Sequence, residues 1–194
     1  MRLVLKRMCL AAAVSLAALA GPAPALETPS AQSAVQRDGQ RDFDWEIGNW
    51  ATYVRVLRNP LTGAAPDWAE FRGTSLVKPV LDGRANSVEL SVKNEKGAIE
   101  GVSLRLYSPQ SRQWSLNYAT VRGGVMTAPV YGGFDGKGRG VFYGQDTIGG
   151  RVILVRFVIA SVSANEAHFE QGYSANGGLS WETNWIAVDT RLPK

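Results

Sequence analysis

The stretch DFDWEIGNW, residues 42–50, marks the point where polar, aperiodic sequence gives way to short hydrophobic segments. Its acidic and aromatic residues indicate a compact turn, and the Gly-x-Trp from Gly48 to Trp50 then opens a segment with strand character. We therefore expect a short turn followed by the first β-strand, over residues 50–57. The folded domain is predicted to begin here and to extend over residues 42–191.

The first 25 residues have the three parts of a secretory signal. Three basic residues lie within the first seven positions, an Ala- and Leu-rich run covers residues 10–20, and a small-x-small site ends at Ala25. A membrane anchor is the alternative, but the run is shorter than the about 20 apolar residues that a transmembrane helix needs. We expect cleavage near Leu26 and a mature protein in the periplasm or outside the cell, not in the membrane.

Removal of this signal changes both the charge and the cysteine content. The chain has 21 basic and 17 acidic residues; the signal takes three of the basic ones, which leaves 18 against 17 and a net charge of +1. This near-neutral balance removes the electrostatic support for nucleic-acid binding. The only cysteine, Cys9, also lies in the signal, so the mature chain has no disulfide, no thiolate nucleophile and no cysteine-based metal site.

Residues 26–41 are rich in Pro, Ser, Gln and Ala without hydrophobic periodicity, so we interpret them as a flexible lead-in with no structural role. From residue 48 onward, turn signals such as Asn-Pro at 59–60 and Asp-Gly at 82–83 recur at short intervals, and no segment between them has a helical period. This pattern is typical of an all-β sandwich or barrel. The strand candidates cover residues 50–57, 68–77, 85–92, 99–107, 114–120, 125–131, 140–147, 152–160, 167–174 and 181–189.

Two of these strands show how side chains are sorted between faces. Over residues 102–107, three aliphatic residues share one face, and Ser103, Arg105 and Tyr107 share the other. Residues 152–159 are almost continuously apolar, so both faces of that strand look buried, as expected for a strand covered by a loop or placed at a dimer contact. Arg156 in its middle is unusual, because arginine is rarely buried without a partner.

Polar residues within the strands are the main candidates for a ligand site. The predicted ligand-binding residues are Arg105, Tyr118, Arg156, Glu170, Asn184 and Trp185. If these faces point into a barrel, the two arginines suit a carboxylate or polyhydroxylated ligand, because a guanidinium binds a carboxylate through two parallel hydrogen bonds. The alternative is a structural network in which Arg and Glu side chains satisfy one another.

The remaining motifs do not indicate a catalytic or cofactor-binding site. SANGGLSW, residues 174–181, resembles the Asp-box of sialidase propellers with Asn176 in place of Asp, but a single copy indicates a hairpin turn rather than a propeller. His168 is the only histidine; it offers one axial ligand for a haem, and without cysteines it cannot build a usual zinc site. No nucleophile elbow, P-loop or dinucleotide-binding fingerprint is present in the sequence. We assign no catalytic residue, no metal and no cofactor.

From residue 42 to residue 191 the chain resembles a bacterial family of lipocalin-like, calycin-type domains of unknown function. The segments that carry the resemblance are 42–50, 101–109, 112–114, 140–144, 155–157, 170–171 and 181–185. The resemblance implies a single antiparallel β-barrel of about eight to ten strands. In such barrels the Trp of Gly-x-Trp closes one end and packs against a basic residue near the last strand, here Arg191. Residues 51–53 depart from the Gly-x-Trp-x-Gly-x-Gly pattern of the haem-binding nitrobindin relatives, which argues against haem.

Three hypotheses for the function follow. The first is an exported, non-enzymatic barrel that binds a small organic molecule. The second is an enzyme, an isomerase or hydrolase acting on a sugar or organic acid, with Glu170 as the base and Arg105 or Arg156 as the anion stabiliser. The third is an interaction module in which residues 152–159 form a homodimer contact. A small organic ligand and a second copy are the candidate partners, and nucleic acid and membrane are not.

Overall fold

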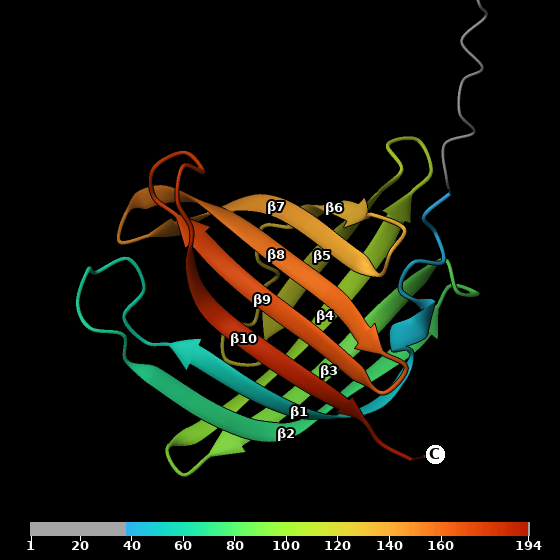
Figure 1. Ribbon diagram of the computed structural model, residues 1–194, viewed down its shortest axis with the longest axis horizontal. Coiled ribbons are helices and arrows are strands. Elements are labelled where there is room, and N and C mark those ends of the chain that lie inside the picture. The colour runs from blue at the N-terminus through green and yellow to red at the C-terminus, as the bar shows by residue number, and fades with distance from the viewer. Residues whose placement is uncertain (1–37, 194) are drawn as a thin grey trace, which may run out of the picture. The chain divides into compact units, whose positions relative to one another are not determined.

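The computed structural model describes residues 38–193; the predicted signal peptide and most of the predicted lead-in lie outside the described residues. Within this range the chain forms ten β-strands and one short 3₁₀ helix, η1. The strands pair antiparallel with their sequence neighbours, and β1 pairs with both β2 and β10, so the sheet closes into a barrel without a free edge (Figure 1). The elements are η1 Asp44–Glu46, β1 Gly48–Leu57, β2 Trp68–Val80, β3 Ala85–Asn94, β4 Gly97–Ser108, β5 Gln113–Thr120, β6 Val130–Phe134, β7 Arg139–Ile148, β8 Arg151–Ser163, β9 Glu166–Ser174 and β10 Glu182–Arg191.

The predicted all-β barrel is confirmed, and each predicted strand overlaps one observed strand. The largest difference concerns β6, which begins at Val130 rather than at residue 125. Residues 121–129 form a loop instead, and Thr127 in this loop donates its backbone N–H to the carbonyl oxygen of Tyr118 at 2.7 Å. The loop therefore occupies part of the β5 edge, and the register between β5 and β6 is short. No helix in residues 38–193 is long and apolar enough to cross a membrane.

Residues 39–47, here called the plug, lie across the end of the barrel at which β1 begins (Figure 1). Phe43 packs edge-on against Trp114 and Phe134, with ring centroids 4.9 and 4.8 Å apart. Gly39 accepts a hydrogen bond from Nε1 of Trp114 at 2.9 Å and donates its N–H to the Tyr107 hydroxyl at 3.0 Å. The prediction that the whole lead-in has no structural role is therefore wrong for its last residues, which belong to the plug.

The predicted contact between Trp50 and Arg191 is confirmed. These residues are opposite each other in the register of β1 and β10, and the guanidinium carbon of Arg191 lies 4.0 Å from the Trp50 ring centroid. Arg191 also donates from Nη1 to the carbonyl oxygen of Ile47 at 2.9 Å and from Nη2 to that of Trp45. The last strand thus fastens the plug to the start of the barrel.

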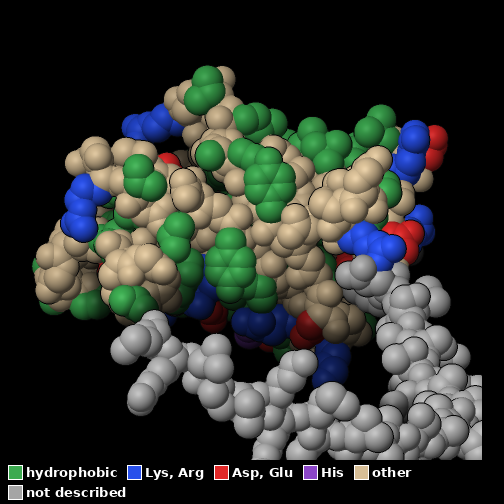
Figure 2. All heavy atoms as spheres, turned by 90° about the horizontal axis from the view of Figure 1, so that it is seen from above, with side chains coloured by type: hydrophobic (Ala, Val, Ile, Leu, Met, Phe, Trp, Pro, Cys, Tyr) green, Lys and Arg blue, Asp and Glu red, His purple; other side chains and the backbone are tan. Residues whose placement is uncertain are grey.

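The outer face of β8 is half-buried, in contrast to the expectation that both faces of this strand are buried. Val152 is 68% exposed, whereas Arg156 stacks on Trp181 with 4.6 Å between the guanidinium carbon and the ring centroid. Trp181 belongs to the turn between β9 and β10, so a loop covers part of the strand. Exposed hydrophobic side chains such as Tyr131 and Tyr143 also occur on neighbouring strands, and Figure 2 shows hydrophobic groups scattered among polar atoms over one face.

Residues 174–181 form the hairpin turn that the Asp-box-like motif predicts. The hydroxyl of Ser174 accepts the N–H of Gly178 at 2.9 Å. The side-chain oxygen of Asn176 accepts the N–H of Ser180 at 3.0 Å, and its side-chain nitrogen donates to the Ser180 hydroxyl at 2.8 Å. These bonds tie side chains to the backbone of the turn, which is the structural role expected of the motif.

Candidate functional site

A cavity of about 150 Å³ lies inside the barrel, and its walls come from η1, β1–β5 and β8–β10. Alternate residues of each strand face it, as strand geometry requires. The apolar part of the wall consists of Val54, Val88, Leu90, Leu116, Phe157, Ile159, Ala167, Phe169, Trp185 and Ala187. The polar part consists of Glu46, Thr52, Ser75, Ser103, Arg105, Tyr118, His168, Gln171 and Asp189.

Asp189 on β10 is the centre of a hydrogen-bonded cluster in the polar wall. Its Oδ1 accepts the hydroxyl of Thr52 on β1 at 2.5 Å and the hydroxyl of Ser75 on β2 at 3.1 Å. Burial raises the pKa of Asp189 to about 6; the Thr52 and Ser75 hydrogen bonds oppose this rise, and the nearby Glu46 carboxylate reinforces it. The cavity therefore contains a carboxyl group that titrates close to neutral pH.

Arg105 on β4 faces the cavity and already has an acidic partner. Its Nη1 donates to one carboxylate oxygen of Glu46 and its Nη2 donates to the other at 3.2 Å. The two side chains are only 8% and 12% exposed, and the guanidinium carbon lies 4.2 Å from the ring centroid of Phe43. Arg105 thus attaches the plug to the barrel wall. This arrangement is the internal Arg–Glu network considered above, with Glu46 in place of Glu170.

Tyr118 on β5 brings an unpartnered polar atom to the cavity wall. Its hydroxyl is buried and has no hydrogen-bond partner among residues 38–193. Burial also raises the pKa of this hydroxyl. The ring lies over Gly101 on β4, where a Cβ would stand 2.5 Å from the hydroxyl oxygen. A buried group left without a partner costs about 1–3 kcal/mol, so a bound molecule that completes the hydrogen bond would recover this energy.

Trp185 lines the cavity, whereas Asn184, which is only 3% exposed, is not one of the lining residues. Asn184 is the extra residue of a bulge in β10, where the register with β9 shifts between Thr183 and Trp185. Its side-chain oxygen accepts a hydrogen bond from Nε2 of Gln171 at 2.8 Å. Since Gln171 faces the cavity, Asn184 holds a cavity side chain in place without lining the cavity itself.

Arg156 and Glu170 do not face the cavity. Alternation along β8 and β9 places them on the outer face, because their neighbours Phe157 and Phe169 point inward. The six predicted ligand-binding residues are therefore separated by the barrel wall. Arg105, Tyr118 and Trp185 line the cavity, Asn184 contacts the lining residue Gln171, and Arg156 and Glu170 lie outside.

His168 pairs with a residue of its own strand, whereas Glu182 contacts the loop between β1 and β2. Nε2 of His168 is 2.8 Å from a carboxylate oxygen of Glu166, and the His168 side chain is 47% exposed although its residue borders the cavity. Glu182 accepts the backbone N–H of Leu61 at 2.6 Å. In the part of the chain that the structure describes, no three His, Cys, Asp or Glu side chains are grouped so as to hold a metal ion.

The cluster around Asp189 is not among the predicted site residues. The orientation of Asp189 could have been inferred from the sequence. Asp189 precedes Arg191 by two positions, and residues two apart in a strand share a face. Arg191 is itself predicted, from the resemblance, to pack against Trp50 at the closed end of the barrel. The partners of Asp189 carry no such signal, since Thr52 and Ser75 are 137 and 114 residues away in sequence.

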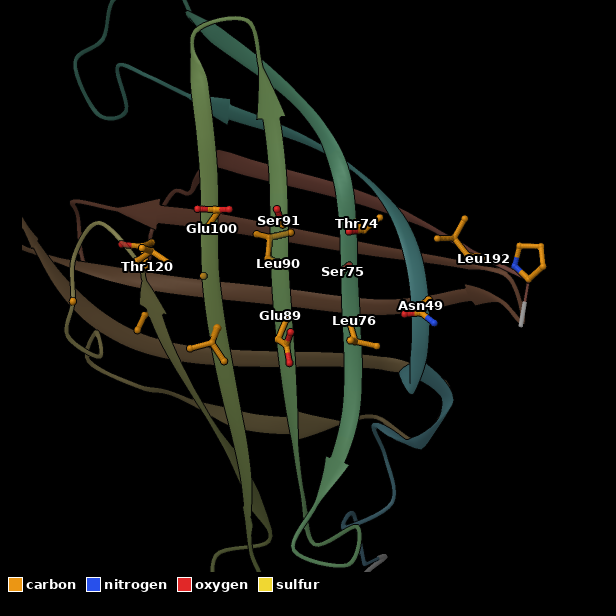
Figure 3. A pocket seen from close by; sticks show the side chains of 16 residues that line it. Asn49, Thr74, Ser75, Leu76, Glu89, Leu90, Ser91, Glu100, Thr120 and Leu192 are labelled. Carbon is orange, nitrogen blue, oxygen red and sulfur yellow. The ribbon is translucent and has the colours of Figure 1, made fainter.

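A second, larger hollow of about 800 Å³ lies on the outer face of β2–β4 (Figure 3). Figure 3 shows Glu89 and Glu100 on adjacent strands and Leu192 beside Asn49, whose carbonyl oxygen accepts the Leu192 N–H at 2.9 Å. Glu89 is already paired with Lys78 at 3.1 Å. Because this hollow is open to solvent, water can satisfy its polar groups. The interior cavity, with its buried carboxyl and hydroxyl groups, is therefore the candidate functional site.

The titration of Asp189 predicts a pH-dependent stability. Its folded-state pKa of about 6 lies above the ordinary value of 3.8, so the protonated group stabilises the fold fully below about pH 4, and this contribution is lost as the pH rises through about 6. About two pKa units correspond to about 3 kcal/mol. We therefore compare the free energies of unfolding of Asp189→Asn and wild type by urea unfolding. The value for the variant minus the value for wild type should increase by about 3 kcal/mol between pH 4 and pH 7.

Asparagine suits this test because its side-chain oxygen still accepts from Thr52 and Ser75. The control is Asp67→Asn, at an exposed site in an ion pair with Arg58. Its difference from wild type in free energy of unfolding, measured over the same pH range, gives the baseline. A difference between Asp189→Asn and wild type that stays constant across this pH range would mean that the Asp189 carboxyl is not desolvated.

The unpartnered hydroxyl of Tyr118 predicts a stabilising substitution. We expect Tyr118→Phe to raise the free energy of unfolding of the ligand-free protein by about 1 kcal/mol or more, because it removes a buried polar atom that no group in residues 38–193 satisfies. Tyr107→Phe is the matched control with the opposite expected sign, since the Tyr107 hydroxyl accepts the Gly39 N–H. Destabilisation of similar size in both variants would show that the Tyr118 hydroxyl has a partner in the ligand-free protein.

No protein-family model matches this chain, and no curated protein matches it. Among solved structures, it is similar to EF1p2_mFAP2b bound to DFHBI, with 10% identity, 79% of this chain and 99% of that chain covered, and a TM-score of 0.44. A redesigned β-barrel, b11L5F_LGL, has 10% identity, coverage of 81% and 100%, and a TM-score of 0.44. The ywiB protein from Bacillus subtilis has 8% identity, coverage of 75% and 93%, and a TM-score of 0.34. These similarities are too distant to transfer a function, so the function has to be inferred from the chain's own interior.

Proposed function

We propose that this protein is an exported, non-enzymatic barrel that binds one small organic molecule in its interior cavity. The observation that carries the proposal is the buried Tyr118 hydroxyl, which stands at the cavity wall without a hydrogen-bond partner among the described residues. Binding sites typically combine an apolar wall with a few polar groups that orient the ligand. The cavity combines the aromatic side chains of Phe157, Phe169 and Trp185 with polar groups, among them the Tyr118 hydroxyl.

The size of the cavity limits the ligand. At about 150 Å³, the interior is smaller than the roughly 300–1,000 Å³ of sites for drug-sized ligands. An engineered apolar cavity of about this volume binds benzene, so one ring with a short substituent is the appropriate size. The rest of the interior is filled, because the aromatic cluster around Phe43 and Trp114 occupies the end of the barrel that the plug covers.

The enzyme hypothesis has less support. It assigns the role of base to Glu170, which is exposed on the outer face of β9, whereas Arg105 lies inside the barrel. Arg105 also binds Glu46 with two hydrogen bonds, so its guanidinium is not free to stabilise a developing anion. Asp189 is the carboxyl group inside the cavity with a raised pKa, and the enzyme hypothesis gives it no role.

Export is part of the proposal and rests on the sequence. The three-part signal over residues 1–25 supports a mature protein in the periplasm or outside the cell. An extracytoplasmic barrel that holds a small molecule would serve as a carrier, a scavenger or a sensor subunit. Cell fractionation with an epitope at the C-terminus tests this part, and full retention of the protein in the cytoplasm would contradict it.

The binding proposal is tested by native mass spectrometry of the mature protein purified from its own host. Ser103→Leu fills the cavity from β4, and Ser91→Leu places the same side chain on the outer face of β3 as the matched control. We expect a bound molecule of fewer than about ten non-hydrogen atoms in wild type and Ser91→Leu, and none in Ser103→Leu. A ligand retained equally by Ser103→Leu, or benzene-sized probes that fail to bind wild type, would contradict the proposal.

A further inference from the structure

The charges inside the barrel do not balance. Apart from the phenol of Tyr118 and the half-exposed His168, the ionisable side chains at the cavity wall are Glu46, Arg105 and Asp189. Glu46 and Arg105 neutralise each other in a buried ion pair. Among the described residues Asp189 has no basic partner, because its hydrogen-bond donors are the neutral hydroxyls of Thr52 and Ser75. With Asp189 ionised, the side chains that line the cavity therefore carry one negative charge in excess. Arg191, two residues along on the same face, does not line the cavity and donates to the carbonyl oxygens of Trp45, Ile47 and Ala164.

The elements packed around Asp189 do not supply that counter-ion. The neighbouring strand β1 contributes Thr52, β2 contributes Ser75, and β9 places Ala167 opposite Asp189 in the register. His168, the next residue on β9, pairs with Glu166 near the surface. The charged groups that act on Asp189 from η1 and β4 are Glu46, which raises its pKa, and Arg105, whose opposing effect is the smallest of the causes.

The aromatic residues of the cavity wall suit the apolar part of an organic cation. Trp185, Phe157 and Phe169 line the cavity, and the two phenylalanine rings pack edge to face with centroids 5.0 Å apart. Aromatic faces attract ammonium groups by roughly 0.5–2 kcal/mol, and more strongly where water is excluded. The same rings bury the apolar part of a ligand. A buried charge without a partner is expensive, so an ammonium group beside Asp189 would replace the missing counter-ion.

We propose that the occupant of the cavity is a small primary amine, bound as its ammonium ion at Asp189 with its apolar ring against Trp185, Phe157 and Phe169. This inference rests on the proposed function and names the ligand class for the same cavity. The proposed amine differs from the carboxylate ligand that the sequence analysis suggests on the basis of Arg105. A carboxylate ligand would meet Asp189 and Glu46, and Arg105 is already neutralised.

The proposal has a direct consequence for pH. Binding of an ammonium ion requires ionised Asp189, and the pKa of this carboxyl is about 6 in the empty protein. The affinity for an amine should therefore rise as the pH increases through about 6 and level off above it. An ammonium ion also lowers the pKa of the carboxyl that it contacts, so amine binding at about pH 6 releases a proton into solution.

Three ligands of nearly equal size and different charge test the ligand class. Benzylamine, benzyl alcohol and benzoate are titrated by calorimetry into the full mature protein at about pH 7.5 and about pH 5. At the higher pH we expect benzylamine to bind at least about tenfold more tightly than benzyl alcohol, and benzoate to bind most weakly. At the lower pH the preference for the amine should shrink by about tenfold, because protonated Asp189 offers no charge.

Two variants assign the preference to Asp189. Asp189→Asn keeps an oxygen that accepts from Thr52 and Ser75 but removes the charge, so it should bind benzylamine and benzyl alcohol equally. Glu89→Gln removes a carboxylate from the outer face and is the matched control, which should keep the preference of wild type. If Asp189→Asn does not fold, the pH dependence of wild type remains as a separate measurement of the same charge.

The outcomes separate this inference from the proposed function. If benzyl alcohol binds wild type as tightly as benzylamine, or benzoate binds best, the amine proposal is overturned and small-molecule binding stands. If the amine preference persists in Asp189→Asn, the assignment to Asp189 is overturned. If none of the three ligands binds up to about 10 mM, both the amine proposal and the proposed function fail.

Discussion

Replacing Arg105 with methionine is expected to lower the free energy of unfolding by about 3–5 kcal/mol, the range for breaking a buried ion pair by removal of one partner. The reason is that Glu46, only 12% exposed, would keep its charge without the guanidinium that neutralises it. The substitution also removes the contact between Arg105 and Phe43, and with it one attachment of the plug. Urea unfolding at neutral pH, followed by tryptophan fluorescence, measures the change.

A double-mutant cycle separates the ion pair from the loss of packing. Glu46→Gln alone should also destabilise, and the double variant should lose less than the sum of the two single losses, because no buried charge is left unpaired. Lys78→Met at the exposed Lys78–Glu89 pair is the control, for which about 0–1 kcal/mol is expected. A loss below about 1 kcal/mol for Arg105→Met would mean that the interior pair is solvated like a surface pair.

Gly132→Ala is expected to destabilise the barrel by about 3 kcal/mol or more, because the added methyl group cannot be accommodated by side-chain movement. A Cβ at Gly132 would stand 2.0 Å from the carbonyl oxygen of Val141 and 2.8 Å from the Cα of Phe142, both backbone atoms of the adjacent strand. Relief requires β6 and β7 to move apart next to the fully buried Phe142. Glycines at such close approaches let barrel strands coil tightly.

Gly133 supplies a control within the same strand. A Cβ at Gly133 would have its nearest neighbour at 3.9 Å, so Gly133→Ala should change the free energy of unfolding by less than about 1 kcal/mol. Gly73→Ala provides an independent repeat on β2, where a Cβ would stand 2.0 Å from the carbonyl oxygen of Ser91. Equal stabilities of Gly132→Ala and Gly133→Ala would show that the close approach between β6 and β7 is not part of the folded state.

These two predictions concern the part of the interior that is packed solid, and the proposed site lies in the other part. Phe142 and Trp114 fill the region beneath the plug, whereas the cavity lies between Tyr118 and Trp185. Arg105 borders both regions, since it touches Phe43 on one side and lines the cavity on the other. Its substitution should therefore affect both stability and ligand binding, whereas Gly132→Ala should act on stability first.

Much of the fold could be predicted from local sequence because its determinants are local. Turn residues and alternating side chains locate the strands, and the hairpin over residues 174–181 is specified by the side chains of its own motif. The contact of Trp50 with Arg191 follows from a resemblance that concerns the first and last strands. The predicted start of β6 at residue 125 is wrong, because residues 125–129 have strand-like composition but form a loop along the edge of β5.

Turn residues and alternating polarity are enough to predict the strands and which side chains of each strand share a face. Which of the two faces points inward depends on long-range packing. On β4 the aliphatic residues Val102 and Leu106 are 37% exposed on the outside, while Arg105 is buried, because the plug brings Glu46 to neutralise it. The site follows the same logic: Asp189 becomes a buried carboxyl group only when closure of the barrel places the first two strands beside the last.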